Sequence, residues 1–550
     1  MVFDIISMRD FTREQILAVL DVADDVKKAI HDPRFNRCEF SQKYGFTVDT
    51  LLSGLKVATL FLESSTRTYY SFRAAVNHAG GICDGFPSPA YTSLRKGETW
   101  EDTVAMFSGY GYDTIVMRST VEGLPRWTKE SLERNHRLLS EQHQRFKEPF
   151  AFPVPLVING GDGTNQHPTQ CFLDLYTMRE AARSKGRKLD GLEVALLNDL
   201  RYGRTNASIM SVAHLFNLKL FLAHPNRFGP PSHRLEDLVR KGVEVHDFEE
   251  DFMAAMASAV VAYQSRPQKE RVGKGEDLIY IKQLGQITKA MYDRLGEKAP
   301  FLMHPLPVDA ENFGEIARDL RYHHLNLTKL QSSNALPVRI ALLALGLGRI
   351  NVGVNFSNDT SQHDQLQLQD LPLSTQDKVL ENPSSGFIKG DGVVLDHIPM
   401  GMARRLYGIL GFEGQVIPKT VADYVPPDNP RKDILKLLRP YQFFAQQYEA
   451  MALIAPDITV SFIESGRVVR KVRPVLGSYT EGLVKCGNLP EDPDKPDERC
   501  VTNVEKEGVA RRHLIELVNG STILRCPYCE RTDTVANVYR ENRFVYLNPA

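Results

Sequence analysis

The chain has 550 residues, of which 42% are hydrophobic and 25% charged, a composition typical of globular proteins that excludes collagen-like, coiled-coil and wholly disordered chains. At a typical length of ~150 residues per domain, three to four domains are expected. Lys and Arg together number 67 against 68 for Asp and Glu, so the net charge of −1 argues against nucleic acid or a membrane surface as a partner.

The first residues, MVFDIISMRD, are acidic where a signal peptide would be basic. The longest strongly apolar stretch, 340–348, is far shorter than the ~20 residues that cross a bilayer. We therefore expect a cytoplasmic protein. An amphipathic helix is predicted directly after Thr12, which forms a capping box with Gln15.

Short apolar runs then alternate with helical segments. Such alternation predicts βαβ units with parallel sheets, here as two doubly wound α/β domains with a cleft between them. The runs are 57–62, 114–117, 155–158, 193–197, 218–223, 259–263 and 300–303. Because ligands bind beyond the carboxyl ends of such strands, the Arg, His and Gln residues that follow these runs are the candidate site.

The segment SSTRT at 64–68 follows one strand and precedes a predicted helix. Backbone N–H groups at a helix N-terminus, with hydroxyls and the Arg67 guanidinium beside them, suit a phosphate dianion, although Ser and Thr there are more often simple caps. His167 and Gln170 stand three residues apart at the start of another predicted helix, on one face. A lone His there would more often be structural.

The chain changes character after residue 348. Residues 349–382 are polar and are predicted to be a linker, followed by a ferredoxin-like α+β sandwich over 383–475 and a small β domain over 476–550.

The last segment contains Cys486, Cys500, Cys526 and Cys529, the second pair in a CPYC knuckle. Four thiolates suit a tetrahedral structural zinc ion with no open position for catalysis. Thirteen residues separate the first pair, so free or disulfide-linked thiols remain the alternative.

Two motifs together resemble the aspartate and ornithine carbamoyltransferase family: FLESSTRTYYSF at 61–72 and HPTQ at 167–170. The resemblance covers residues 1–348. It implies a carbamoyl-phosphate-binding domain over 1–168, completed by a helix near 330–348, and a second-substrate domain over 169–329. It also implies that Ser65, Thr66, Arg67 and Thr68 bind the phosphate, that Thr68, Arg118 and His167 face the carbonyl oxygen, and that Gln170 orients the carbamoyl NH2.

The second substrate distinguishes the branches of this family. Aspartate has two carboxylates and calls for two guanidinium groups, whereas one of these would repel the distal ammonium of ornithine. The segments DLRYGRT and SRPQKER match the aspartate branch, which implies that Arg204 binds the α-carboxylate and that Arg266 with Gln268 binds the side-chain carboxylate. In HPLP, the resemblance implies main-chain carbonyl contacts from Leu306 and Pro307 to the substrate amines.

This chain departs from the family pattern at three positions. Tyr69 and Arg73 replace a usual Arg–Glu pair, which we expect to be a local structural substitution. Val308 stands where an Arg is usual and leaves the contacts of that loop open. The segments 36–53 and 126–152 are longer than the family core.

Ser93 and Lys96 match a family loop that reaches into the active site of the neighbouring subunit, which implies a homo-oligomer built on catalytic trimers with shared sites. An isolated Lys in a loop is otherwise usually solvated.

Residues 383–550 resemble the regulatory subunit of aspartate carbamoyltransferase, on the segments DHIP, RKDILK and KVRP. The resemblance implies a nucleotide site at Asp396, Lys436 and Lys471 for ATP or CTP as effectors. The irregular stretch 384–392 weakens the match, and a role in assembly alone is the alternative.

The sequence therefore predicts an aspartate carbamoyltransferase of pyrimidine synthesis, which converts carbamoyl phosphate and L-aspartate to N-carbamoyl-L-aspartate and phosphate. A carbamoyltransferase for a different amino acid and a catalytically silent scaffold are the alternatives. The presence of Arg67, His167, Arg204 and Arg266 argues against both.

Overall fold

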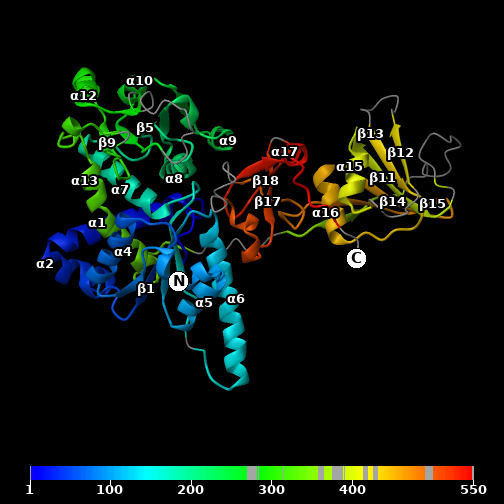
Figure 1. Ribbon diagram of the computed structural model, residues 1–550, viewed down its shortest axis with the longest axis horizontal. Helices are drawn as coiled ribbons and strands as arrows, with labels where there is room; N and C mark the ends of the chain where they lie inside the picture. Colours follow the sequence, from blue (N-terminus) through cyan, green and yellow to red (C-terminus); the bar gives the residue numbers. More distant parts are fainter. Residues whose placement is uncertain are drawn as a thin grey trace. The chain divides into compact units, whose positions relative to one another are not determined.

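The structure is a computed structural model that describes residues 2–150, 152–268, 282, 284–311, 314–356, 364–373, 388, 390–412, 419–424, 432–489, 499–518 and 520–547. The chain divides into two compact units (Figure 1). Unit 1 comprises Met1–Asn358 and Pro490–Val501, and unit 2 comprises Asp359–Leu489 and Thr502–Ala550. No helix among the described residues is long and apolar enough to span a membrane.

Unit 1 opens with α1 (Arg13–His31), whose N-terminus has the predicted capping box: the Thr12 side chain accepts from the Gln15 backbone, and the Gln15 side chain accepts from the Thr12 N–H. Ile16, Leu20 and Ala23 are fully buried, as their helical spacing predicts. Short helical pieces follow: α2 (Pro33–Phe35) directly precedes the long segment 36–53, and α3 (Ser41–Tyr44) lies within it.

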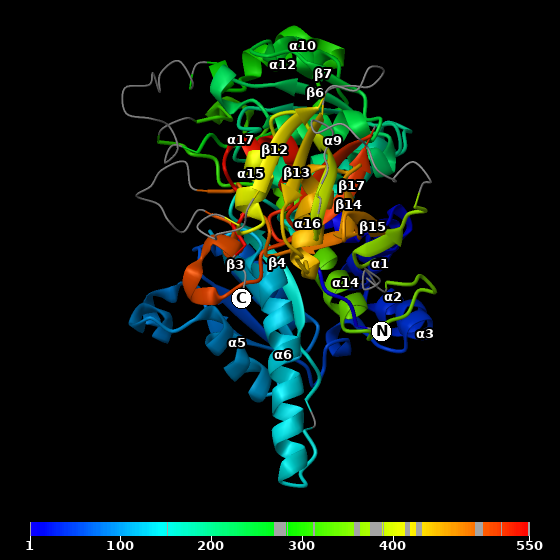
Figure 2. The same cartoon turned by 90° about the vertical axis from the view of Figure 1, so that its right-hand side faces the viewer.

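The first sheet is parallel, with the strand order β2-β1-β3-β4. Its strands are β1 (Lys56–Phe61), β2 (Ile82–Phe86), β3 (Thr114–Ser119) and β4 (Leu156–Asp162). The connecting helices are α4 (Thr66–His78), α5 (Trp100–Gly109) and α6 (Leu124–Arg145), and α7 (Pro168–Ser184) leads to the next domain. Both views show the far end of α6, part of the long segment 126–152, extending beyond the sheet (Figures 1 and 2).

The second sheet is also parallel, in the order β7-β6-β5-β8-β9. The strands are β5 (Glu193–Leu197), β6 (Lys219–Ala223), β7 (Val245–Asp247), β8 (Val261–Gln264) and β9 (Phe301–Met303), and the helices are α8 (Arg204–Val212), α9 (Ser232–Arg240), α10 (Phe252–Ala257) and α12 (Lys289–Leu295). The predicted pair of doubly wound domains is confirmed. Two further helices, α13 (Thr328–Ser333) and α14 (Ala335–Gly346), follow, and α14 packs against α1, α4 and α7.

Unit 2 contains a six-stranded sheet in the order β10-β15-β14-β11-β13-β12, antiparallel throughout. The elements are β10 (Gln367–Asp370), β11 (Gly392–Pro399), α15 (Ala403–Ile409), β12 (Lys419–Tyr424), β13 (Lys432–Leu437), α16 (Ala445–Ile454), β14 (Thr459–Glu464) and β15 (Arg467–Val475). From β11 to β14 the order βαββαβ confirms the ferredoxin-like sandwich. Residues 357–363 and 374–387, which hold part of the predicted linker and the start of the irregular stretch, lie outside the described residues.

Another antiparallel sheet in unit 2 has the order β16-β17-β18-β19. Its strands are β16 (Tyr479–Glu481), β17 (Arg512–Val518), β18 (Ser521–Arg525) and β19 (Thr532–Thr534), followed by α17 (Val535–Arg540). The small β structure expected after residue 475 is therefore present. Most of the acidic loop that separates the first cysteine pair, 490–498, lies outside the described residues.

Candidate active site

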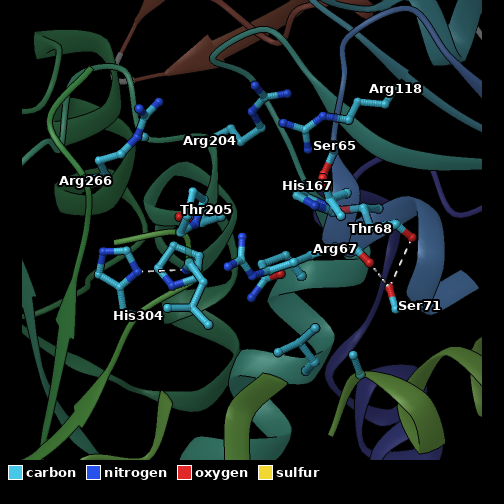
Figure 3. A pocket seen from close by; sticks show the side chains of 18 of the residues that line it. Ser65, Arg67, Thr68, Ser71, Arg118, His167, Arg204, Thr205, Arg266 and His304 are labelled. Carbon is cyan, nitrogen blue, oxygen red and sulfur yellow. Dashed lines mark hydrogen bonds between the residues drawn. The ribbon is translucent and has the colours of Figure 1, made fainter. Parts of the chain in front are cut away.

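A pocket of about 750 Å³ in unit 1 collects the polar segments that follow the strands. Figure 3 shows side chains of α4, of α8 and of the loops after β8 and β9 around it. Apart from Ser93 and Lys96, the predicted site residues of the catalytic half line this pocket: Ser65, Thr66, Arg67, Thr68, Arg118, His167, Gln170, Arg204, Arg266, Gln268, Leu306 and Pro307. Ser93 and Lys96 are exposed residues of a short 3-10 helix.

One end of the pocket is the N-terminus of α4. Ser65 is the N-cap residue with extended backbone, and its side chain forms no capping hydrogen bond within the described part of the chain. The first N–H groups of α4 have no acceptor within the helix, so they can bind an anion. Thr68 is buried, and the exposed Arg67 guanidinium has no ion pair with any described residue. This end of the pocket is therefore suited to a phosphate group.

A carboxylate, Glu63, joins two arginines in the pocket. Its Oε1 accepts from Arg118 Nη2 at 2.8 Å and from Arg204 Nη2 at 2.7 Å, and its Oε2 accepts from Arg204 Nη1 at 2.8 Å. Arg118 Nη1 also donates to the Gly160 carbonyl at 3.1 Å. The Arg204 fork thus already grips a carboxylate in two-point geometry, the contact that a substrate carboxylate requires.

The charges in this cluster shift the pKa values of its members. Burial raises the pKa of Glu63, but Arg204 and Arg118 lower it by more, to about 2. Burial, assisted by Arg204, lowers the pKa of Arg118 to about 10. All three groups are therefore ionised at neutral pH, and the cluster carries one net positive charge.

His167 lies at the N-terminus of α7 and is 4% exposed. Its backbone N–H donates to Ser208 Oγ at 2.9 Å. Because Ser208 belongs to α8, this bond ties His167 to the domain that contains the second sheet. Burial, reinforced by the charges of Arg118, Arg204 and Arg339, lowers the pKa of His167 well below 6.5. The imidazole is therefore neutral at physiological pH and offers one N–H donor.

The side of the pocket lined by Arg204 and Arg266 is organised by Asp199, a buried carboxylate in the loop after β5. Asp199 Oδ2 accepts from the Gln268 N–H at 3.1 Å, and Oδ1 accepts from the Tyr202 N–H at 2.9 Å. Gln268 Nε2 donates to the Tyr202 carbonyl at 2.8 Å. These bonds hold the loops that carry Arg204 and Arg266 next to each other. Residues 269–271 of the second motif lie outside the described residues.

The loop after β9 completes the pocket. The buried His304 accepts from the Leu306 N–H at Nδ1 (2.7 Å), and its Nε2 lies 3.1 Å from Glu315 Oε1. Leu306 has a φ of 59°, and the Leu306–Pro307 peptide bond is cis. Val308, at the position of a usual Arg, packs against an apolar cluster that includes Leu302. The loop is thus held by buried contacts in place of an arginine.

In α4, the residues Tyr69 and Arg73, which depart from the family pattern, contact each other. Arg73 donates to the Tyr69 hydroxyl at 3.2 Å, and its guanidinium lies 5.5 Å from the centre of the Tyr69 ring. This contact between residues four apart on a helix agrees with the expectation that the Tyr69–Arg73 pair structurally replaces the usual Arg–Glu pair.

Several pocket residues were missed by the sequence reasoning. Glu63 stands inside the 61–72 motif but received no role, because its partners are 55 and 141 residues away in the chain. Arg339, Gln331 and Ser332 line the pocket from α13 and α14, which the sequence predicted only as a completing helix. A polar residue inside an apolar helix, such as Arg339 at 2% exposure, was the available signal.

The four clustered cysteines come together, as predicted. Their Sγ atoms all lie within 4.8 Å of one another, and each residue is buried. In a tetrahedral site with zinc–sulfur bonds of ~2.3 Å, the sulfur atoms are ~3.8 Å apart. Cys486 and Cys529 have an Sγ–Sγ distance of 3.5 Å, which is too long for a disulfide bond, and none of the four cysteines forms a disulfide with a described residue. The donor set therefore fits a zinc ion.

The predicted nucleotide residues lie on one sheet of unit 2. The register pairs Lys436 with Val394, Val394 with Ser461 and Ser461 with Lys471, so the two lysines end one row across four strands, ~14 Å apart. Lys436 is 6% exposed, and burial lowers its pKa. Asp396 pairs with Lys432 at 2.8 Å. Lys432, which directly precedes Asp433 in the RKDILK motif, was not singled out from the sequence.

Three family comparisons cover most of the chain. Residues 4–180 match the family described as "Aspartate/ornithine carbamoyltransferase, carbamoyl-P binding domain", and residues 190–345 match its "Asp/Orn binding domain". Residues 388–475 match "Aspartate carbamoyltransferase regulatory chain, allosteric domain".

Individual relatives agree with these matches. The aspartate carbamoyltransferase catalytic subunit of Thermococcus onnurineus is 36% identical over 345 residues, 63% of this chain and 97% of the relative. A structure of the M. jannaschii catalytic subunit has a TM-score of 0.51 and 32% identity, and covers 63% of this chain and 98% of that one. A Trypanosoma cruzi aspartate transcarbamoylase in complex with carbamoyl phosphate has a TM-score of 0.50 and 28% identity, and covers 62% and 95%. The chain therefore belongs to the aspartate carbamoyltransferase family and joins a catalytic chain to a regulatory-chain allosteric domain.

Proposed function

We propose how the pocket residues divide the work of carbamoyl transfer from carbamoyl phosphate to L-aspartate. The phosphate binds at the N-terminus of α4, to Ser65, Thr66, Arg67 and Thr68. The observation that supports this most directly is the open helix N-terminus beside an Arg67 that has no ion pair among the described residues, in the same pocket as the neutral His167.

The carbonyl end of the substrate faces Thr68, Arg118 and His167. Attack of the aspartate amine on the carbamoyl carbon places negative charge on the carbonyl oxygen, and the C–O bond to phosphate then breaks. Fixed donors aimed at that oxygen lower the barrier. A neutral His167 donates its N–H there, and the leaving phosphate accepts the amine proton. Gln170 accepts a hydrogen bond from the carbamoyl NH2.

Aspartate binds through its two carboxylates. Arg204 takes the α-carboxylate, which must share or replace the contact that Glu63 makes in the substrate-free pocket. Arg266 and Gln268 take the side-chain carboxylate, and the carbonyls of Leu306 and Pro307 accept from the amine. The test is Arg67→Ala, which we expect to raise the KM for carbamoyl phosphate and leave that for aspartate nearly unchanged. The opposite pattern would overturn the division of the pocket.

The cysteine cluster is proposed to bind one structural zinc ion. Four thiolates leave no open coordination position, so the ion would supply folding free energy to residues 476–550 and no chemistry in the pocket. Metal analysis of the purified chain should give one zinc per chain.

The allosteric domain is proposed to bind ATP or CTP through Asp396, Lys436 and Lys471. Two lysines at the ends of one row can contact a triphosphate along its length. Titration of aspartate saturation with each nucleotide separates this role from assembly alone, which predicts no shift.

The chain is further proposed to form catalytic trimers, in which Ser93 and Lys96 of one copy complete the pocket of the next. Both residues are exposed and stand outside the pocket of their own chain. Mixing Lys96→Ala and His167→Ala chains tests this, because shared sites restore activity in the mixture and separate sites do not. We also propose that the domains end at residues 168, 329 and 475, and that the linker ends at residue 382.

A further inference from the structure

Another buried carboxylate, Asp174, lies behind the pocket wall. It belongs to α7, is fully buried, and stands one helical turn after Gln170. Gln170 Nε2 donates to Asp174 Oδ1 at 2.9 Å. The helix α7 packs against β4 of the first domain, α8 of the second, and both α13 and α14. Asp174 is therefore placed where the two halves of the pocket meet.

Two more donors reach the same carboxylate from distant parts of the chain. The Tyr263 hydroxyl donates to Oδ2 at 2.8 Å, and Gln331 Nε2 donates to Oδ1 at 2.7 Å. Tyr263 stands in β8, three residues before Arg266. Gln331 links Asp174 to the 304–307 loop, because its Oε1 accepts from the His304 N–H at 2.8 Å. The Asp174 carboxylate thus accepts hydrogen bonds from Gln170, from the strand that leads to Arg266, and from Gln331, which holds the 304–307 loop.

The chemistry of a carboxylate fixes the orientation of both amides. An ionised carboxylate only accepts hydrogen bonds, so each glutamine must present its NH2 to Asp174 and its oxygen to the other side. For Gln331 the oxygen meets the His304 N–H. For Gln170 it faces the pocket, where an acceptor is needed for the carbamoyl NH2. With a flipped amide, Gln170 would present a donor to a donor.

Asp174 has no ion pair within the described residues, and the charge of Arg339 lowers its pKa. Burial outweighs this charge and the three hydrogen bonds and raises the pKa of Asp174 to about 7, so the carboxylate is ionised and accepts all three hydrogen bonds above that pH. Apolar side chains at such a position are often as stable as a buried charge or more so. Stability alone therefore gives no reason for a carboxylate here.

We propose that Asp174 is a positioning residue that sets the orientation of the Gln170 amide and supports the 304–307 loop through Gln331. The inference rests on the proposed role of Gln170. It assigns Asp174 no contact with substrate, because Asp174 does not line the pocket.

The test is a double-mutant cycle of Asp174→Leu and Gln170→Ala in the full chain, with kcat and KM for carbamoyl phosphate as readouts. A misplaced or flipped orienting group costs ~100-fold in kcat/KM, so we expect each single variant to lose about that much and the double variant little more. Thr177→Val is the matched control. Thr177 is equally buried on α7 and accepts from Asn334 Nδ2 at 3.0 Å, and its loss should change kcat/KM less than ~3-fold.

Losses that multiply in the double variant, or an Asp174→Leu loss no larger than that of Thr177→Val, would overturn the inference and leave the proposed function intact. A Gln170→Ala variant with full activity would instead overturn the role of Gln170, and this inference with it. If Asp174→Leu does not fold, the nearly isosteric Asp174→Asn decides. We expect it to lose ~10-fold in the parent and almost nothing beside Gln170→Ala, because charged acceptors bind roughly twice as strongly as neutral ones. An equal loss in both backgrounds, or none, contradicts the inference.

Discussion

Replacement of His167 distinguishes a hydrogen-bond donor from a general base. His167 is 4% exposed, and burial together with three nearby arginines lowers its pKa well below 6.5. A group with a pKa well below 6.5 stays neutral as the pH falls through 6.5, so its protonation state does not change in that range. We expect its N–H to donate to the carbonyl oxygen. Removal of one such donor costs ~3 kcal/mol, or roughly 100- to 1,000-fold in kcat.

The assay is the initial rate of product formation by His167→Ala at saturating substrates, between about pH 6 and pH 8. We expect kcat to fall by ~100-fold or more, with a pH profile parallel to that of the wild type. His136→Ala is the control and should keep full activity, because His136 is a half-buried histidine on α6 outside the pocket lining. An acidic limb in the wild type that His167→Ala lacks would show that ionisation of His167 controls the rate in this range, as expected of a general base with an ordinary pKa, and would refute the reasoning.

Four further outcomes are expected. Arg266→Ala should raise the KM for aspartate by ~10- to 100-fold, since a charged hydrogen-bonded pair contributes ~1.5–3 kcal/mol, and Arg266→Lys should not restore it; an unchanged KM would remove Arg266 from the site. Glu63 has a pKa lowered to about 2 from 4.5, so the stability it contributes is present above pH 4.5 and is lost as the pH falls towards 2; the melting temperatures of wild type and Glu63→Gln should therefore converge below pH 4.5, and a constant difference would contradict the ion-pair cluster. Cys526→Ser should lower both the bound zinc and the melting temperature, and full zinc retention would exclude Cys526 as a ligand. Lys471→Ala should abolish any shift of aspartate saturation by ATP or CTP without changing the unregulated rate; an intact shift would place the effectors elsewhere.

The sequence was sufficient for features carried by contiguous residues. Seven of the nine parallel strands described in unit 1 were found because each is an apolar run, and the α4 site because its motif spans five adjacent residues. The edge strands β2 and β7 were missed, because ICDGF and VHD are short and partly polar. Strand β10 was missed, since QLQD has a single apolar residue, is exposed along its whole length and lies inside the predicted linker. It pairs with β15, and only this long-range pairing makes it a strand.

The less predictable part of the site depends on contacts between distant residues. Glu63 acquires its function from Arg118 and Arg204, and Asp174 from Tyr263 and Gln331, so neither role is visible in a local pattern. The cysteine cluster lies between these cases. Its ligands were named from the sequence, but the long spacing of the first pair left the geometry open until the sulfur atoms were found together.

The most direct test of the account is a ureido-product assay of the full chain with carbamoyl phosphate and either L-aspartate or L-ornithine. Arg204 and Arg266 in one pocket should bind two carboxylates and repel a distal ammonium. We predict rapid, saturable formation of N-carbamoyl-L-aspartate and no saturable turnover of ornithine. Turnover of ornithine in preference to aspartate, or no turnover of either, would contradict the account.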